Sequence, residues 1–214
     1  MKKLLLLCAL FLSVPAVAEE YYDYYGLQEY GLRKNTTRVE LYGGMALPQD
    51  DWVHNGQPVD LGGTGWTVGL GFTRNLSRYF ALGLDGNYAQ MGDGDTFTSG
   101  GQDAYYRTGI ATGLVTGRVN FFPTQATRLY IPFGMGVGHM FARQKNDDGS
   151  HLTTNSTDLA WMLGLGLEFD LDETVIFGVE GRYNLIEADS EFKDAFGKSR
   201  YHYLSVMLKI GTRF

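Results

Sequence analysis

The chain has 214 residues, a single cysteine and a formal net charge of −6 at pH 7. An acidic chain is a poor candidate for nucleic-acid binding, which depends on cationic side chains that neutralise phosphates. A lone cysteine excludes an intramolecular disulfide, and no apolar run reaches the roughly 20 residues that a transmembrane helix needs.

The first 18 residues have the layout of a secretory signal peptide. Lys2 and Lys3 precede a nine-residue apolar run, and Ala16-Val17-Ala18 supplies small residues at a cleavage site. Cleavage after Ala18 removes the only cysteine, which lies inside the apolar run. We therefore predict an exported protein whose mature form has no thiol chemistry.

Residues 19–36 are predicted to form a periplasmic N-terminal lead. The segment is rich in tyrosine, and its place at a terminus favours a flexible lead. A short periplasmic docking peptide is the alternative interpretation.

From residue 37 onward, apolar and polar side chains alternate in eight segments. Successive side chains of a strand point to opposite faces, so each segment predicts a strand with one apolar and one polar face. The fourth segment is the least regular, because Ile110 and Leu114 share a face with Arg118. Pro132 has no N–H to donate and should sit near the start of its strand or at a bulge. The predicted strands are 38–47, 64–73, 79–90, 106–122, 129–141, 158–170, 175–185 and 203–214.

The connections between these strands sort by length. The short ones follow the second, fourth and sixth strands and are 74–78, 123–128 and 171–174. The long, polar ones follow the first, third, fifth and seventh strands and are 49–63, 91–104, 143–157 and 186–200. Short periplasmic turns and long extracellular loops are typical of outer-membrane barrels, whereas a soluble sandwich has no reason to sort them. Because lipid cannot bond the backbone, spanning strands must close into a barrel.

Aromatic residues cluster near both ends of the predicted strands, as in the girdles of membrane barrels. Those toward the short turns are Phe80, Phe121, Phe133, Phe169, Phe177 and Phe214. Those toward the long loops are Trp66, Tyr88, Phe141, Trp161 and Tyr183.

These features resemble the OmpA/OmpX-type small outer-membrane β-barrels over about Thr37 to Phe214. The resemblance is carried by the glycine-rich runs Pro132–Gly138 and Trp161–Phe169 and by the terminal strand. It implies an all-β, eight-stranded antiparallel up-and-down transmembrane β-barrel, with Phe214 as the final aromatic of the assembly signal. OmpA itself continues into a peptidoglycan-binding domain, whereas this sequence ends at Phe214, so the resemblance does not imply tethering to the cell wall.

The polar faces of the strands carry charges of both signs, and eight strands enclose an interior just wide enough for side chains. Buried charges need partners, so we predict a salt-bridge network that fills the barrel. A narrow gated channel, in which Glu180 and Arg182 switch partners, is the alternative. The inward charges are Arg38, Glu40, Asp85, Arg118, Glu168, Asp170, Glu180, Arg182, Lys209 and Arg213.

Catalysis and metal binding have little support in the sequence. His202 and Ser205 are three residues apart, so on a strand they point to opposite faces and cannot share a site. The remaining histidines are dispersed without metal-ligand spacing, and the acidic turns at 93–95 and 147–149 have too few oxygen ligands for a calcium loop. We predict no catalytic site, no metal and no cofactor.

The sequence thus predicts a monomeric barrel in the outer membrane of a Gram-negative-type bacterium, with a structural or surface-interaction role through its extracellular loops. A small channel for ions or apolar solutes is the second candidate, and an enzyme is the third. The expected partners are outer-membrane lipid and lipopolysaccharide, the barrel assembly machinery at the C-terminal strand, and a host or other surface ligand at the loops.

Overall fold

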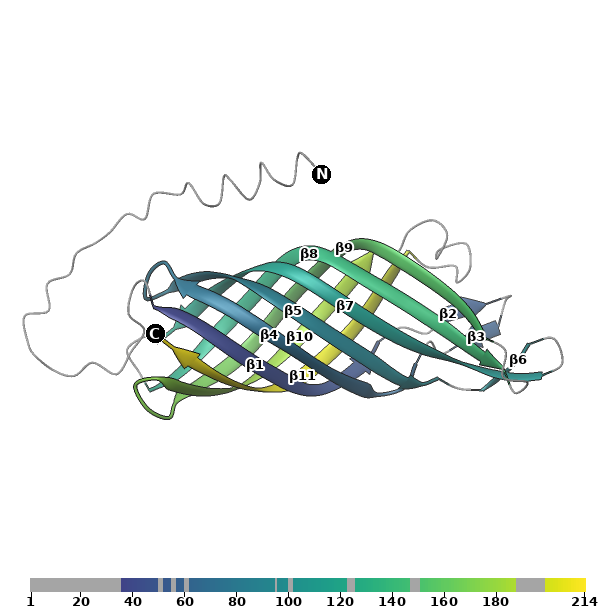
Figure 1. Ribbon diagram of the computed structural model, residues 1–214, viewed down its shortest axis with the longest axis horizontal. Coiled ribbons are helices and arrows are strands. Elements are labelled where there is room, and N and C mark those ends of the chain that lie inside the picture. The colour runs from purple at the N-terminus through teal and green to yellow at the C-terminus, as the bar shows by residue number, and fades with distance from the viewer. Residues whose placement is uncertain are drawn as a thin grey trace, which may run out of the picture.

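Eight long antiparallel strands close into a barrel in the computed structural model of the chain (Figure 1). The strands are β1 (Thr37–Pro48), β4 (Gly65–Asn75), β5 (Phe80–Asp93), β7 (Gln102–Phe121), β8 (Thr127–Asn146), β9 (His151–Asp170), β10 (Val175–Glu187) and β11 (Arg200–Arg213). The structure describes residues 36–49, 52–54, 57–59, 62–94, 96–99, 102–122, 126–146, 151–187 and 199–214. The predicted signal peptide and nearly all of the lead lie outside the described residues.

Each long strand pairs with the next long strand in the sequence, and β11 pairs with β1 to close the sheet. At this seam the N–H of Thr37 donates to the carbonyl of Phe214 (2.9 Å) and the N–H of Phe214 donates to the carbonyl of Thr37 (3.0 Å). The first strand therefore begins where the last one ends, at the end of the barrel that carries the short turns. The predicted eight-stranded up-and-down barrel is confirmed.

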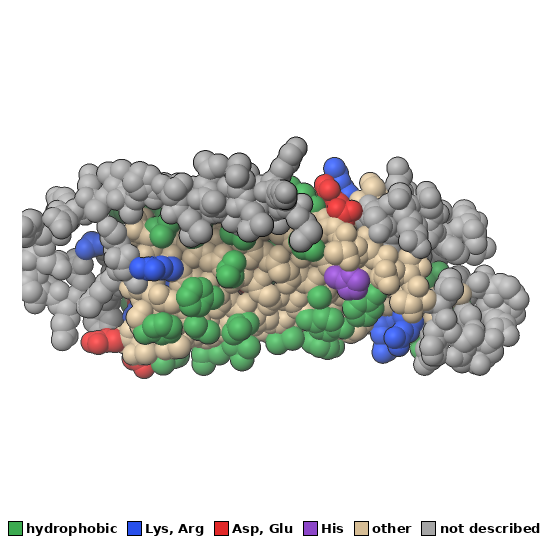
Figure 2. All heavy atoms as spheres, turned by 45° about the horizontal axis from the view of Figure 1, so that its top comes forward, with side chains coloured by type: hydrophobic (Ala, Val, Ile, Leu, Met, Phe, Trp, Pro, Cys, Tyr) green, Lys and Arg blue, Asp and Glu red, His purple; other side chains and the backbone are tan. Residues whose placement is uncertain are grey.

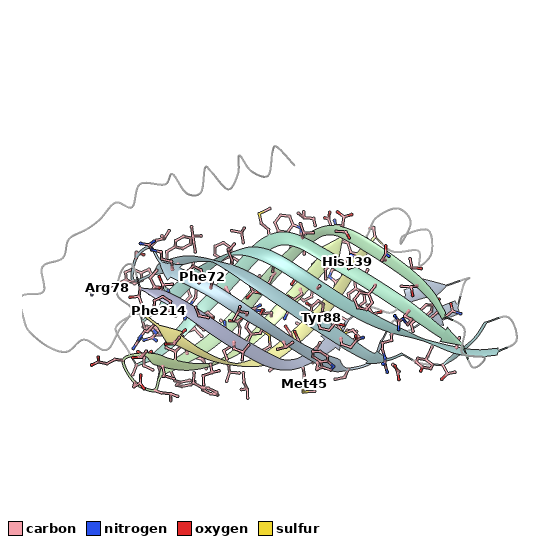
Figure 3. All side chains as sticks on the ribbon, in the orientation of Figure 1. Met45, Phe72, Arg78, Tyr88, His139 and Phe214 are labelled. Atoms are coloured by element: carbon pink, nitrogen blue, oxygen red, sulfur yellow. The ribbon has the colours of Figure 1, made fainter. Side chains whose placement is uncertain are left out.

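The outer wall carries a continuous apolar belt. Large aliphatic side chains on every long strand are exposed, which in a membrane barrel means that they face lipid. On the visible face, groups of hydrophobic side chains are distributed along the wall and charged ones gather toward its two ends (Figure 2). Figure 3 places Phe72, Arg78 and Phe214 toward the turn end, and Tyr88 and His139 farther along the barrel, near the middle of its drawn length. Among the described residues no helix is long and apolar enough to cross a membrane.

Three strands extend well beyond the apolar belt. β7, β8 and β9 have 20 residues each, about twice the 9–11 residues that a tilted membrane strand needs. The prediction of a long loop at 143–157 is therefore wrong in part, because β8 continues to Asn146 and β9 begins at His151. The alternating pattern fades there because the outward face no longer has to be apolar once it leaves the lipid.

Two of the other long connections contain short strands. β2 (Trp52–His54) pairs with β3 (Gln57–Val59) inside the first predicted loop. β6 (Phe97–Ser99) pairs with the beginning of β7 inside the second. The short turns lie between the strands as predicted, apart from residues 74 and 75, which belong to β4, and residues 127 and 128, which belong to β8.

Pro132 lies inside β8, not near its start. The pairing of β8 with β9 is interrupted at Ile131 and Pro132, and the register of the two strands is the same on both sides of this interruption. The expectation of a strand start or a bulge is wrong, because the loss of one ladder hydrogen bond is tolerated without a shift of register.

Gly44 marks a close approach of two backbones at the seam. A Cβ at this position would lie 1.9 Å from the carbonyl oxygen of Val206 and 2.7 Å from the Cα of Met207. We expect Gly44→Ala to destabilise the barrel by about 1–3 kcal/mol, because the seam strands must move apart. The matched control is Gly86→Ala, where no atom lies within 4 Å of the new methyl group. Guanidinium unfolding in detergent micelles measures both, and equal midpoints for the two variants would contradict the prediction.

The turn between β9 and β10 is held by a side chain. Asp172 accepts hydrogen bonds from the N–H groups of Thr174 (2.6 Å) and Val175 (2.7 Å). These bonds, with Val175 the stronger influence, hold the pKa of Asp172 below its ordinary value of 3.8. Arg213 donates to the carbonyl oxygens of Asp172 and Glu173 and ties the turn to the last strand.

A lowered carboxyl pKa predicts a pH dependence of stability. The contribution of Asp172 is present above the pKa of the unfolded chain and is lost as the pH falls through the lower pKa of the folded chain. We expect Asp172→Ala to reduce stability at neutral pH and to leave it unchanged at the acid end of that range. Unfolding midpoints of both proteins over a pH series that runs from neutral to well below the ordinary carboxyl pKa measure this, and a constant difference between them would argue against the prediction.

Candidate functional site

Eight of the ten charged residues predicted to face the barrel interior are buried in it, and Asp170 and Arg213 are half-buried. The residual exposure of the eight buried residues is 7% or less, although each is ionisable. They come from β1, β5, β7, β9, β10 and β11. Because successive side chains of a strand point to opposite faces, these residues point into the lumen while their sequence neighbours face lipid. These residues are Arg38, Glu40, Asp85, Arg118, Glu168, Glu180, Arg182 and Lys209.

Glu168 is the centre of the network near the turn end. Its carboxylate accepts from Arg38 (2.9 and 3.0 Å), Arg118 (2.6 Å) and Arg128 (2.7 and 3.2 Å). These partners lie on three other strands, with Arg38 130 residues away in the sequence. Asp170 pairs with Arg128 and with Arg213 (3.1 Å) at the periplasmic edge of the same cluster.

Lys209 connects this cluster to the middle of the lumen. Its Nζ lies 2.7 Å from Glu40 and 2.9 Å from Glu180. The hydroxyl of Tyr130 also donates to Glu180 (2.6 Å), and the Arg118 guanidinium lies over the Tyr130 ring at 3.5 Å. Two carboxylates, two cations and one aromatic ring thus fill the cross-section.

Arg182 forms the layer above. Its Nη1 and Nη2 donate to the two oxygens of Asp85 at 3.0 Å each, and its Nε donates to Glu180. Two parallel bonds between a guanidinium and a carboxylate are a strong and geometrically specific pairing. The hydroxyl of Tyr42 donates to Asp85 (2.7 Å), so the pair is also held from the side.

Several members of the network were missing from the sequence prediction. Arg128 was assigned to a short turn, but it is the second residue of β8 and is fully buried. Tyr42 and Tyr130 act as hydrogen-bond donors, and Asn75 accepts from Arg38 (3.0 Å). Arg128 and Tyr130 lie four and two residues before Pro132, which the sequence pattern assigns to the inward face. This two-residue spacing is the signal that could have placed both side chains in the lumen.

An apolar layer occupies the lumen on the extracellular side of the charges. Its residues lie on seven of the eight long strands, and each is at most 5% exposed. The irregular face of the fourth predicted strand is explained here, since Ile110 and Leu114 point into this layer. The members are Ala46, Ala89, Met91, Tyr106, Ile110, Leu114, Met140, Ala142, Ala160, Met162, Ile186, Tyr201 and Tyr203.

Little free space lies within the charge network. Two cavities within the charge network have volumes of about 10 and 20 Å³. A volume of about 10–15 Å³ holds one water molecule. Cavities of this size have room for a water or two among the charges.

The structure also shows where the terminal aromatic and the His202–Ser205 pair lie. Phe214 is 73% exposed beside the start of β1. His202 contacts the hydroxyl of Tyr183 on the outer face, while Ser205 is buried in the lumen. The described part of the chain holds no group of three or more His, Cys, Asp or Glu side chains that could hold a metal ion.

A closed antiparallel barrel with an apolar outside and a charged inside defines an integral outer-membrane β-barrel protein. The chain belongs to the outer membrane protein beta-barrel domain family, whose model matches residues 4–214. No curated protein matches the chain.

Solved outer-membrane barrels are similar in fold. Neisserial surface protein A shares 10% identity over 85% of this chain and 100% of its own, with a TM-score of 0.51. Ail of Yersinia pestis shares 19% identity over 85% of this chain and 100% of its own, with a TM-score of 0.49. OprG from Pseudomonas aeruginosa shares 17% identity over 86% of this chain and 98% of its own, with a TM-score of 0.48. At these identities the likeness concerns the fold alone.

Proposed function

We propose that the protein is a sealed barrel that anchors a projecting extracellular surface in the outer membrane and does not conduct. The observation that carries the proposal is the filled lumen. Ion pairs around Glu168, Lys209 and Arg182 occupy the turn half, and a buried apolar layer occupies the loop half. Either layer alone opposes the passage of ions, because an ion cannot keep its hydration in a space that side chains fill.

The projecting strands supply the surface for contact. β7, β8 and β9 run past the apolar belt, and the β2–β3 hairpin lies at the same end (Figure 1). A rigid sheet that extends beyond the lipid presents side chains at fixed positions, which favours specific contact with a ligand outside the cell. The proposed role is contact with the surroundings, with the barrel as its anchor.

Planar-bilayer recording of the folded chain tests the sealed lumen. We expect no openings above the bilayer baseline. Steady openings in the unmodified protein would overturn the proposal in favour of a channel for ions or apolar solutes. The shift in gel mobility between unboiled and boiled samples verifies that the recorded protein is folded.

A hairpin deletion tests the contact role. Replacing residues 52–59 by a short Gly-Ser linker should reduce attachment of expressing cells to host or matrix surfaces while the gel shift of the barrel is retained. Unchanged attachment of cells expressing the shortened barrel would remove the hairpin from the proposed contact surface.

A further inference from the structure

Two arginines face each other on the outer wall, just beyond the apolar belt. Arg107 on β7 and Arg143 on β8 are direct partners in the strand register, and both are exposed. Cβ atoms of such partners lie about 4.5–5.5 Å apart. Two cationic side chains at this spacing repel each other unless an anion lies between or above them.

Only part of this charge is neutralised by the protein. The Nε and Nη2 of Arg107 each lie 2.7 Å from one oxygen of Asp93, while its side chain remains 54% exposed. Arg143 has no ion pair among the residues that the structure describes. Among the described residues, the two guanidinium groups therefore share this face with a single paired carboxylate, which contacts Arg107 alone.

An aromatic shelf lies directly below the two arginines and consists of Trp66, Tyr88 and Phe141. The Phe141 ring lies across Gly109 of β7, where a Cβ would come within 2.1 Å of it. The ring is stacked with Tyr88 (centroids 6.5 Å apart), and Tyr88 contacts Trp66 (5.5 Å). Because Gly109 has no side chain, the shelf continues unbroken from β4 to β8.

The level of the shelf and the arginines is the one expected for the boundary between lipid tails and headgroups. Aromatic side chains of barrel girdles occupy that level. Arg107 and Arg143 are each two residues beyond the row of Gly109 and Phe141, or about 6–7 Å farther along the strands. Thr153 and Asn155 of β9, the register partners of Arg143 and Phe141, are exposed and add hydrogen-bonding groups.

We propose that Arg107 and Arg143, above the aromatic shelf, bind a phosphate group of an anionic glycolipid in the outer leaflet. A guanidinium donates two parallel hydrogen bonds to phosphate, and two of them surround it better than two ammonium groups. A lipid is favoured over a soluble anion because the shelf joins the arginines to the apolar wall without a break. The ligand must therefore cover an apolar surface and a cationic one together.

Titration of the folded chain in detergent micelles with fluorescent lipid A tests the site, because lipid A carries phosphates on a sugar with acyl chains. We expect Arg107→Gln and Arg143→Gln each to weaken binding about fivefold and the double variant about thirtyfold. Dephosphorylated lipid A should bind equally to all these proteins. Arg74→Gln, an outward arginine at the turn end of β4, removes the same charge from the opposite rim and should have no effect.

Three results would overturn the proposal. They are an unchanged affinity in the double variant, an equal loss in Arg74→Gln, and binding of soluble inositol hexakisphosphate as tight as that of lipid A. A stability measurement adds a readout specific to a ligand site. Without lipid A, Arg143→Gln should not lower the unfolding midpoint, because it removes a like-charge contact; with lipid A it should lower it. None of these results depends on whether the lumen conducts.

Discussion

Replacing Glu168 by glutamine is expected to lower the free energy of unfolding by about 3–5 kcal/mol. Among the described residues, Glu168 is the one carboxylate that contacts Arg38, Arg118 and Arg128 together. Glutamine keeps the size of the side chain but removes its negative charge. Three buried cations would then lie close to one another, with only Glu40 and Asp170 left to compensate at the edges.

Guanidinium unfolding in detergent micelles measures this loss. The matched control is Glu173→Gln, the same change at an exposed position in the turn between β9 and β10, and it should leave the midpoint almost unchanged. A second variant separates charge from packing. Adding Arg118→Met to Glu168→Gln removes one of the uncompensated cations and should recover part of the stability. A loss of similar size in the control, or a further loss in the double variant, would contradict the assignment of Glu168 as the centre of the network.

The strands could be predicted because each faces two different solvents. Because lipid lies outside and the lumen is polar, apolar and polar side chains alternate along each strand. The sequence alone therefore places Leu208 on the outer face and Lys209 on the inner face. The alternation of apolar and polar side chains ends where the outer face of a strand leaves the lipid and meets water. On β8 and β9 beyond the lipid the outward face becomes polar, as at Thr153 and Asn155, and paired backbone was mistaken for loop.

The partners of the buried charges could not be predicted, because they depend on the registers of several strand pairs at once. Glu168 and Arg38 meet across the lumen only after β1 has paired with β11, and β10 with both β11 and β9. The apolar layer was missed for a different reason. Met140 and Tyr203 belong to inward faces that the sequence pattern marks as glycine-rich or polar, and nothing local shows that such residues converge on one level of the barrel.

Two layers that close the lumen independently predict an unusual pattern of conductance. We expect Asp85→Ala with Arg182→Ala, which removes both partners of one ion pair, to leave bilayer conductance at baseline. We expect the same of Tyr203→Ala, which opens the apolar layer alone. All three substitutions together should produce discrete single-channel openings, because the remaining layer in each simpler variant still excludes hydrated ions.

This pattern of conductance distinguishes two barriers in series from a single barrier. Leu204 is next to Tyr203 on β11 but faces outward, so Leu204→Ala combined with the charge-pair variant is the matched control and should stay closed. If the charge pair were the only barrier, its removal alone would open the barrel; if the apolar layer were the only one, Tyr203→Ala alone would suffice. A closed triple variant that still shows the gel shift of a folded barrel would contradict the two-layer arrangement and would mean that the side chains around Lys209 and Glu168 also close the lumen. Openings that need both changes would instead show that side chains far apart in the sequence, Asp85 and Tyr203, act on one path through the barrel.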